Sequence, residues 1–399
     1  MIGLEYPPHN SGGLGVATEG MTQALAGQNT QIYLTLPYQS DMTIGHMQVL
    51  SCFDPSWNTP GRPPFAAYGN TAETVKRVQT LDAFDLRALP QSEMEQKVDE
   101  YARLVSVQAM KLRKQFEVVH AHDWMSFPAA IKVKQATGKP LIAHIHSTEY
   151  DRIPSGHGSP YIMRSEYEGM HRADVVVAVS YYTKQLLVDK YHINPDKIEV
   201  VHNGIFPAQD IQLDKSAFAP RKPLVVFMGR LTSQKGAEYF LQLARAVHVQ
   251  KPEALFMVAG SGDLYHELLF KAAGKQLTAT VLFSGFLRDQ QRNRLLDRAD
   301  VFVMPSLSEP FGLVALEAAQ RHTPVIVSKN TGVAEVMSSA ISVDFWDVQA
   351  MTREVVRLLS DTSHSQEVVS KQLREVNQVT WDKAADKIRS VYRNLFHHS

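Results

Sequence analysis

The sequence contains very little cysteine, with Cys52 the single one among 399 residues. One cysteine cannot form an intramolecular disulfide, which excludes the small disulfide-stapled secreted domains and favours a reducing compartment. The chain also lacks a net charge, because 41 Lys and Arg residues balance 41 Asp and Glu residues. A nucleic-acid-binding protein usually carries a basic excess, so we expect no nucleic-acid partner. An anionic ligand would have to be held by local charges.

Long apolar runs are also missing. No segment reaches the roughly 18–20 apolar residues that a membrane-spanning helix needs, and a run such as 175–179 has only the length of a strand. The first residues show no basic region followed by a long apolar run, so we expect no signal peptide. The sequence therefore predicts a cytoplasmic protein without an integral membrane segment.

Short runs rich in Val and Ile alternate with helical patterns along the chain. These runs are 31–36, 117–120, 141–146, 174–179, 198–202, 224–228, 254–258, 280–283, 300–304 and 324–327. They lack strict polar alternation, as is typical of parallel strands buried on both faces, so we predict an α/β fold with doubly wound parallel sheets. The first strand would be residues 2–5, which is shorter than the usual five to six or so residues.

We predict two Rossmann-like domains, an N-terminal one over residues 1–205 and a C-terminal one over 224–380. Between them, the polar segment 206–223 contains Pro207, Pro220 and Pro223 and is expected to be a linker. From Trp381 to Phe396, apolar residues recur at helical spacing and predict an amphipathic helix within 381–399. We expect this helix to dock on the N-terminal domain; packing on the second domain is the alternative.

Ligands of open parallel sheets bind at the carboxyl ends of the strands, where unusual residues should therefore gather. After the first predicted strand come Gly12, Gly13, Leu14 and Gly15, and a helix is expected to begin near Val16. These glycines would let backbone N–H groups approach a ligand. The spacing differs from the dinucleotide fingerprint, so a phosphate loop and a structural turn both stay open.

The second predicted domain places two cations in one loop. The strand over 224–228 is followed by Gly229, Arg230 and, five residues later, Lys235. The planar fork of Arg230 and the point charge of Lys235 could converge on one diphosphate. The alternative is two solvated surface charges, which is the commoner fate of such residues. The next strand ends at Gly260, in a tight loop that by itself could be only a turn.

Two carboxylates follow the strand over 300–304. Glu309 and Pro310 precede Gly312 and Leu313, and a helix containing Glu317 follows. We expect Pro310 at the first helical position and the N–H groups of Gly312 and Leu313 exposed at the helix start. Glu317 would lie roughly 12 Å along the helix from Glu309, so the pair could bind two distant hydroxyl groups of one extended ligand. The alternatives are an acid that complements the helix dipole and a solvated helix face.

Four histidines, His120, His122, His144 and His146, stand at the ends of two predicted strands. Their spacing does not match the HxHxDH pattern of metallo-hydrolases and no cysteine supports a zinc site, so we expect no metal. Side chains alternate between the faces of a sheet, and we expect at most one His pair to share a wall. We expect core roles for His120 and His144 and a substrate contact for His146.

Taken together, these motifs resemble the retaining family 4 glycosyltransferases of GT-B fold, in particular the branch similar to glycogen and starch synthases. The matching segments are 5–8, 12–15, 120–124, 146–150, 202–204, 229–230, 235–236 and 308–312, together with the Glu309-x7-Glu317 spacing. The resemblance implies two Rossmann-like domains facing a cleft. It also implies transfer of a hexose, glucose first, from a nucleotide-diphosphate sugar to a glycan or other hydroxyl acceptor, forming an α-glycosidic bond without a metal or other cofactor.

The resemblance also implies roles for individual residues. The diphosphate would be clamped by Arg230 and Lys235, Glu309 would orient the sugar hydroxyls, and Glu317 would hold the ribose. The residues assigned to catalysis are His146, Arg230, Lys235 and Glu309; those assigned to donor binding are Gly12, Gly13, Gly15, Gly229, Gly260, Gly312, Leu313 and Glu317.

The chain departs from the family pattern at three places. Bacterial glycogen synthases carry Lys where this chain has Asn10, the family often has Asp where Phe206 stands, and a second Gly is common beside Gly332. These departures leave the nucleotide, the sugar and the acceptor open. Two other functions also remain as alternatives: a catalytically inactive protein that binds nucleotide sugars, and a nucleotide-sugar epimerase of related fold.

Overall fold

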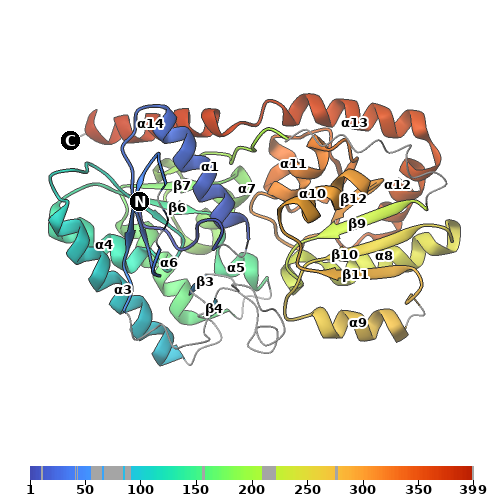
Figure 1. Ribbon diagram of the computed structural model, residues 1–399, viewed down its shortest axis with the longest axis horizontal. Coiled ribbons are helices and arrows are strands. Elements are labelled where there is room, and N and C mark those ends of the chain that lie inside the picture. The colour runs from blue at the N-terminus through green and yellow to red at the C-terminus, as the bar shows by residue number, and fades with distance from the viewer. Residues whose placement is uncertain are drawn as a thin grey trace. The chain divides into compact units, whose positions relative to one another are not determined.

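The computed structural model describes residues 1–9, 12–40, 42, 44–54, 65–66, 84–85, 91–154, 158–208, 222–274 and 277–397. The chain forms two compact units (Figure 1). Unit 1 comprises Met1–Tyr150, Ser155–Gly204 and Thr380–Ser399, and unit 2 comprises Asp151–Pro154 and Ile205–Val379. Among the residues described, every helix is too short or too polar to cross a membrane.

Unit 1 is built on a parallel sheet. Its strands are β1 (Tyr33–Leu36), β2 (Gln48–Ser51), β5 (Val119–His122), β6 (Leu141–Ile145), β7 (Val175–Ala178) and β8 (Ile198–Val200). Ile2 forms parallel bridges to Thr35 of β1 and Ala121 of β5 and so joins the two parts of the sheet. The predicted first strand is thus reduced to one bridging residue. A separate parallel pair, β3 (Phe65–Ala66) and β4 (Phe84–Asp85), also belongs to this unit.

Helices cover the sheet of unit 1, and its core lies between the strands and these helices. They are α1 (Gly13–Gly27), α3 (Gln91–Lys111), α4 (Phe127–Thr137), α5 (Glu149–Arg152, which continues into unit 2), α6 (Pro160–Arg172), α7 (Tyr181–Tyr191), the short η3 (Pro195–Lys197) and α14 (Trp381–His397). The chain end α14 packs on α1, as Figure 1 shows in red and blue. The indole of Trp381 lies so close to Gly20 of α1 that an added Cβ would approach it to 2.1 Å.

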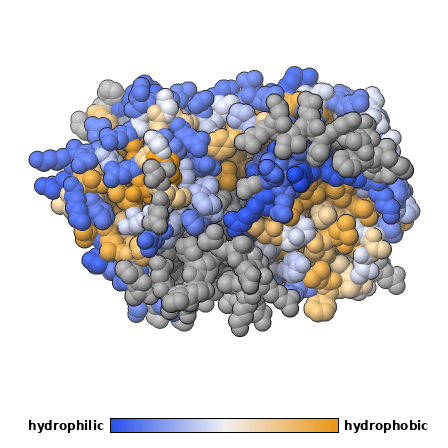
Figure 2. Space-filling model, in the orientation of Figure 1, coloured by the Kyte–Doolittle hydropathy of each residue, from blue (hydrophilic) through white to orange (hydrophobic). Residues whose placement is uncertain are grey.

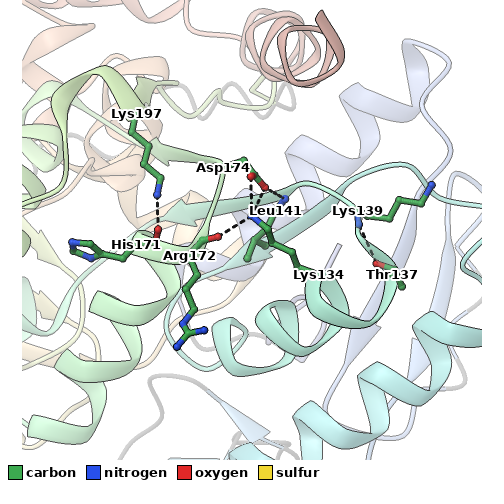
Figure 3. Close-up of polar contacts among 8 residues, drawn as sticks. All are labelled: Lys134, Thr137, Lys139, Leu141, His171, Arg172, Asp174 and Lys197. Carbon is green, nitrogen blue, oxygen red and sulfur yellow. Dashed lines mark hydrogen bonds and ion pairs between the residues drawn. The ribbon is translucent and has the colours of Figure 1, made fainter. Parts of the chain in front are cut away.

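The amino ends of β6 and β7 are tied together by one carboxylate (Figure 3). Asp174 accepts hydrogen bonds from the backbone N–H of Leu141, at 2.7 Å, and from Lys134 Nζ, also at 2.7 Å. Lys134 further donates to the carbonyl of Arg172 at 3.0 Å. This network holds the two strands together at their amino ends. The ligand is expected at the other end of the sheet, where the strands have their carboxyl ends.

Unit 2 contains a six-stranded parallel sheet. The strands are β9 (Leu224–Met228), β10 (Leu255–Ala259), β11 (Val281–Gly285), β12 (Val301–Met304), β13 (Val325–Ser328) and β14 (Ile341–Val343), in the order β11-β10-β9-β12-β13-β14. By position in the chain this order is 3-2-1-4-5-6, that of the dinucleotide-binding Rossmann folds. The predicted fold class of two Rossmann-like parallel-sheet domains is therefore confirmed. The strand order reverses between β9 and β12, which defines the switch point where ligands bind in such sheets.

The helices of unit 2 are α8 (Ala237–Gln250), α9 (Tyr265–Gly274), α10 (Asp289–Arg298), α11 (Leu313–Gln320), α12 (Val348–Ser360) and α13 (Thr362–Val376), with short turns η5 (Ser233–Lys235) and η6 (Gly332–Glu335). The core centres on Phe227, Phe240 and Phe256, which are almost completely buried. Apolar residues also gather on the surface over α9 and β11 (Figure 2), where Phe270 is 79% exposed. That patch lies at the edge strand of the sheet, not at the switch point.

Candidate functional site

The loops that follow β9 and β12 touch each other through their backbones. Gly236 ends η5 with a φ of +69°, and a Cβ at this position would lie 1.9 Å from the carbonyl oxygen of Pro305. Only glycine combines this left-handed conformation with so close an approach. The contact is reinforced by Gln234, whose carbonyl accepts from the N–H of Leu307 at 2.8 Å and whose side chain donates to the carbonyl of Ser308 at 3.1 Å.

This contact brings two of the predicted site residues together. Lys235 Nζ lies 2.6 Å from Glu309 Oε2, and the two side chains are only 18% and 9% exposed. The hydroxyl of Ser306 also donates to Glu309 Oε2, at 3.3 Å. Glu309 is fixed through its backbone as well, since its N–H donates to the carbonyl of Asn330 at 2.9 Å. A cation and a carboxylate from different loops therefore share one partly buried position at the switch point.

The loop after β10 closes against the loop after β9 in the same manner. The N–H of Gly229 donates to the carbonyl of Ala259 at 3.0 Å. Gly260 has a φ of +142°, and a Cβ there would lie 1.9 Å from the carbonyl oxygen of Gly229. Arg230 lies in the β9 loop between these contacts and Lys235, and its residue is half-buried. The predicted residues Gly229, Arg230, Lys235 and Gly260 thus all belong to two adjoining loops.

Helix α11 begins later than the sequence suggests. Pro310 is not its first residue; the helix begins at Leu313, and Gly312 precedes it with a φ of +106°. The reason is that Glu309 pairs with Thr331 in a parallel bridge, which holds this part of the chain extended. The N–H groups of Gly312, Leu313 and Val314 have no hydrogen-bond partner among the residues described. They form a half-buried set of donors at the positive end of the helix dipole.

Glu317 does not lie on a solvated helix face. Its side chain is 16% exposed and forms an ion pair with Arg292 of α10, whose Nη1 lies 3.3 Å from Oε1. The second carboxylate oxygen, Oε2, is buried without a hydrogen-bond partner. Burial raises the pKa of Glu317, and the charges of Arg292 and Arg321 offset part of this rise. A buried acceptor without a partner is a ready site for a ligand hydroxyl.

The glycine run of unit 1 is a helix start and not a loop. Helix α1 begins at Gly13, with Gly12 in extended conformation before it, and thus three residues ahead of Val16. Gly15 is buried in the first turn. A Cβ added to Gly12 would meet no atom within 4 Å. The N–H groups of the first turn of α1 have no hydrogen-bond partner in the described part of the chain and are therefore what unit 1 offers to an anion at this position.

The four histidines lie together on one face of the unit 1 sheet, so the expectation that at most one pair shares a wall is wrong. Strands β5 and β6 are neighbours with His122 opposite His144, and residues two apart on a strand point the same way. His122 Nδ1 lies 3.0 Å from His146 Nε2, and His120 Nε2 lies 3.0 Å from His144 Nδ1.

Burial lowers the pKa of all four imidazoles, well below the usual range for His120, His122 and His144, so the cluster is neutral at pH 7. Neutral imidazole is the form that binds metals, and the ligand atoms of His120, His122 and His144 lie within 4.8 Å of one another. Both ring nitrogens of His120 are already engaged, however, one with His144 and one with the Tyr392 hydroxyl at 2.7 Å. A metal would have to break this chain of hydrogen bonds, and the absence of a metal cofactor stays a prediction.

His146 stands just beyond the carboxyl end of β6. Its N–H donates to Asp123 Oδ1 at 2.7 Å, which fixes the backbone at this position. Its ring stacks on that of His144 with the centroids 4.2 Å apart. Nδ1 of His146 has no hydrogen-bond partner among the residues described. The same holds for Nε2 of His122 and of His144, so three imidazole nitrogens of the cluster lack a partner, and that of His146 lies just beyond the carboxyl end of β6.

Sequence reasoning missed the residues that hold the site in place. Arg292 was not predicted because α10 is rich in charge and nothing in its sequence distinguishes this arginine from its neighbours. Asn330 was missed as well, although it fixes the loop that carries Glu309: its carbonyl binds the N–H of Glu309, and its side chain donates to the carbonyl of Leu307 at 3.0 Å. Its position after a buried strand was the one available signal.

Comparisons with known proteins agree with this geometry. The profile of the family Glycosyl transferases group 1 matches residues 208–393, and that of Glycosyltransferase Family 4 matches residues 56–209. An uncharacterised glycosyltransferase of Methanocaldococcus jannaschii is 28% identical over 98% of this chain and 97% of its own. The glycogen synthase of Mycobacterium tuberculosis is 26% identical over 98% and 93%, respectively.

Among solved structures, HepE of Anabaena in complex with UDP-glucose superimposes with a TM-score of 0.73 at 16% identity. The superposition covers 98% of this chain and 99% of HepE, and at this identity it bears on the fold alone. Its fold agrees with the two Rossmann-like units described above, and the family profiles cover both of them. The chain belongs to the family 4 glycosyltransferases of GT-B fold, of the glycogen synthase-like type.

Proposed function

We propose that this glycosyltransferase is a retaining enzyme that moves a hexose, glucose first, from a nucleotide-diphosphate sugar to a hydroxyl group of a glycan or other acceptor. The observation that carries the proposal is the partly buried pair of Lys235 and Glu309 at the switch point of the unit 2 sheet. The glycogen synthase of M. tuberculosis and the UDP-glucose complex of HepE support this class of donor.

The diphosphate would be bound by the positive groups of unit 2. In the ligand-free chain Glu309 neutralises Lys235, and an incoming diphosphate would take over the ammonium group. Arg230 belongs to the same loop and would supply a planar, bidentate fork. The unpaired N–H groups of Gly312 and Leu313 would add backbone donors to the phosphate oxygens. These groups stabilise the charge that develops on the leaving nucleotide, so transfer needs no metal.

Glu309, released from Lys235, would accept hydrogen bonds from hydroxyl groups of the donor sugar. Glu317 would accept one from the ribose through its unpartnered Oε2. The bond between the anomeric carbon and the phosphate oxygen breaks, and the acceptor oxygen forms its bond to that carbon on the same face. The leaving phosphate takes the acceptor proton, which gives an α-linked product from an α-linked donor. His146 and the start of α1, with Gly12, Gly13 and Gly15, would contribute the contacts from unit 1.

The proposal is tested by Lys235→Ala, with Lys329→Ala as the matched control. Both lysines pair with a carboxylate, but the Lys329–Asp344 pair is exposed, with side chains 58% and 37% accessible. With UDP-, ADP- and GDP-glucose and a mixture of glycans, we expect Lys235→Ala to lower kcat/KM at least about 100-fold and Lys329→Ala to leave it unchanged. Near-wild-type transfer by Lys235→Ala would refute the diphosphate clamp.

Two further measurements separate this proposal from its alternatives. Binding of a nucleotide sugar without nucleotide release in any acceptor mixture would point to an inactive binding protein. A product of inverted anomeric configuration in an NMR spectrum would refute retention, and loss of all transfer in EDTA would refute the metal-free mechanism. Conversion of the free donor to its epimer would indicate an epimerase.

A further inference from the structure

The histidine cluster of unit 1 contains two pairs of hydrogen-bonded rings. His120 Nε2 lies 3.0 Å from His144 Nδ1, and His122 Nδ1 lies 3.0 Å from His146 Nε2. Burial lowers the pKa of each ring, so all four are neutral at pH 7 and each carries a hydrogen on only one of its two nitrogens. In each pair, therefore, one nitrogen donates and the other accepts, and the partners of a ring decide which of its nitrogens carries the hydrogen.

The first pair receives its direction from helix α14. The Tyr392 hydroxyl lies 2.7 Å from His120 Nδ1, and this nitrogen is the one hydrogen-bond partner of the hydroxyl among the residues described. The hydroxyl hydrogen is satisfied there only if Tyr392 donates to His120 Nδ1. His120 then carries its own hydrogen on Nε2 and donates it to His144 Nδ1. His144 in turn carries its hydrogen on Nε2, which has no partner in the described part of the chain.

The second pair follows the first through the register of the sheet. His122 stands opposite His144 on the neighbouring strand, and the ring centroids are 5.3 Å apart. Nε2 of His122 also lacks a partner among the described residues. Hydrogens on Nε2 of both rings would place two N–H groups in one buried region without an acceptor, which is costly. A bare Nε2 on His122 avoids this cost, so His122 carries its hydrogen on Nδ1 and donates it to His146 Nε2.

His146 ends the series with a hydrogen on Nδ1. Its Nε2 accepts from His122, so the N–H of the neutral ring is at the nitrogen that has no partner among the described residues. The backbone of His146 is fixed by Asp123, whose Oδ1 accepts from its N–H at 2.7 Å. His146 follows β6 directly, at the end of the sheet where ligands of parallel sheets bind. Its imidazole N–H is thus placed to bind an oxygen atom that offers a lone pair.

We propose that Tyr392 and the buried His120, His144 and His122 form a tautomer relay, a series of rings that fixes His146 as an Nδ1–H donor to an oxygen atom of the ligand. His122 is the positioning residue that touches His146, and Tyr392 sets the direction at the far end of the series. The tautomers stand on the cluster alone, whereas the identity of the ligand, the sugar of a nucleotide-sugar donor, rests on the proposed function. A sugar hydroxyl that donates its own hydrogen to a carboxylate has only lone pairs left, and it then binds an N–H but not a bare nitrogen.

The tautomers are read directly from long-range ¹H–¹⁵N NMR spectra of the full chain, labelled with ¹⁵N in histidine and recorded without ligand at pH 8. Bare and hydrogen-bearing imidazole nitrogens differ widely in ¹⁵N chemical shift, and single substitutions assign the four rings among the 16 histidines. We expect the Nε2–H form for His120 and His144 and the Nδ1–H form for His122 and His146. An Nε2–H form of His146 in this spectrum would overturn the proposal.

His122→Leu tests whether this ring sets the tautomer of His146, with His171→Leu as the matched control. Leucine has no hydrogen to donate, and His171 is exposed on α6. In His122→Leu we expect His146 to change to the Nε2–H form, which neutral histidine favours in water, and kcat/KM for the donor to fall at least about tenfold. His171→Leu should change neither. A fall in transfer with His146 still in the Nδ1–H form would assign His122 a merely structural role and overturn the relay.

Tyr392→Phe tests the far end of the relay. Without the hydroxyl, nothing directs the hydrogen of His120 to Nε2, so His120 and His144 should show mixed tautomers. A spectrum with unchanged tautomers in this variant would overturn the role of Tyr392 and with it the relay.

The spectrum and the transfer assay separate the relay from the proposed function. The expected tautomers in a chain that transfers no sugar would support the relay and refute the proposed function. Transfer by a chain whose His146 has the Nε2–H form would overturn the relay and leave the proposed function standing. The spectrum of the unaltered chain keeps the test decisive if His122→Leu or Tyr392→Phe does not fold.

Discussion

Replacing Gly236 by alanine should destabilise unit 2 far more than the same change at Gly285. The two glycines have nearly the same left-handed conformation, with φ of +69° and +72°. They differ in their surroundings, because a Cβ at Gly236 would lie 1.9 Å from the Pro305 oxygen, whereas nothing lies within 4 Å at Gly285. The comparison Gly236→Ala against Gly285→Ala therefore isolates the contact between the two loops from the backbone conformation itself.

The expected loss of unfolding free energy has two parts, the cost of the left-handed conformation and the cost of the close contact with Pro305. A left-handed alanine costs about 1–2 kcal/mol, and both variants bear this cost. Real Cβ atoms essentially never approach closer than 3.0 Å, so the loops after β9 and β12 must move apart by at least 1.1 Å (3.0 minus 1.9) in Gly236→Ala. This shift would stretch the hydrogen bond from Leu307 to Gln234. We expect a total loss of at least about 4 kcal/mol, which is in the range reserved for severe disruptions.

The assay is urea unfolding with hydrogen exchange of the β9 and β12 amides, which reports on unit 2 itself. A second readout is affinity for the proposed nucleotide-sugar donor, since the shift would separate Lys235 from Glu309 and should weaken donor binding in Gly236→Ala alone. If the two variants lose the same free energy of unfolding to within about 0.5 kcal/mol, the reasoning is refuted, because the loops would then tolerate a side chain at this contact.

Three further predictions concern other parts of the chain. Burial lowers the pKa of the Met1 amine to about 5 from 8.0. As the pH falls from 8 towards 5, this amine becomes protonated in the unfolded chain before it does so in the folded chain. The free energy of unfolding should therefore fall by up to about 4 kcal/mol. N-terminal acetylation should abolish the part of this loss that occurs above pH 6.5 or so. The four buried histidines, whose pKa values are lowered, should add to this loss of stability below pH 6.5 or so. A urea midpoint that stays constant from pH 8 to 5 would contradict the predictions for the Met1 amine and for the histidines. Tyr392→Phe leaves His120 Nδ1 buried and unpaired and should cost about 1–3 kcal/mol in urea unfolding, against almost nothing for Tyr265→Phe. Arg292→Ala should weaken donor binding in titration calorimetry and should raise the pKa of Glu317 further. The change Arg294→Ala, at an exposed position of the same helix, should alter neither the donor affinity nor this pKa.

The central strands could be predicted from the sequence because burial on both faces demands continuous apolar runs. The strand predicted over 224–228 coincides with β9, and most of the others overlap observed strands. The strand predicted over 117–120 shares only Val119 and His120 with β5, and the one predicted over 2–5 is reduced to the bridges of Ile2. The short pair β3 and β4 was missed, and so were two edge strands of the larger sheets, β2 over Gln48–Ser51 and β14 over Ile341–Val343. An edge strand is covered less completely, and their residues are mostly half-buried or exposed, so neither produces a run that stands out.

Helix starts were predicted less well, and the reason is tertiary contact. Pro310 has the intrinsic preference for a first helical position, but the bridge between Glu309 and Thr331 extends the chain there and delays α11 to Leu313. At α1 the helix begins earlier than predicted and not later, because Gly13 lies inside it although glycine is a poor helix former. The predicted linker over 206–223 falls largely outside the described residues, which end at 208 and resume at 222.

The candidate site could be predicted in part because the carboxyl ends of parallel strands converge. Lys235 and Glu309 were each identified from their position after a strand, and the structure places them 2.6 Å apart. The histidine cluster could not be predicted, because it depends on the register that sets His122 opposite His144. Register follows from the packing of whole strands and leaves no local mark in the sequence.

The chemistry of the switch point depends on backbone contacts that only glycine permits. Gly236 and Gly260 let three loops meet through their carbonyl groups, and this places Lys235 against Glu309. A partly buried ion pair contributes little net stability, because the loss of hydration offsets most of the attraction between the charges. In the proposed function, exchanging Glu309 for a diphosphate at Lys235 would therefore cost the fold little, and it would free the carboxylate for the sugar. Overall neutrality thus coexists with a cation and a carboxylate that lie 2.6 Å apart at the switch point.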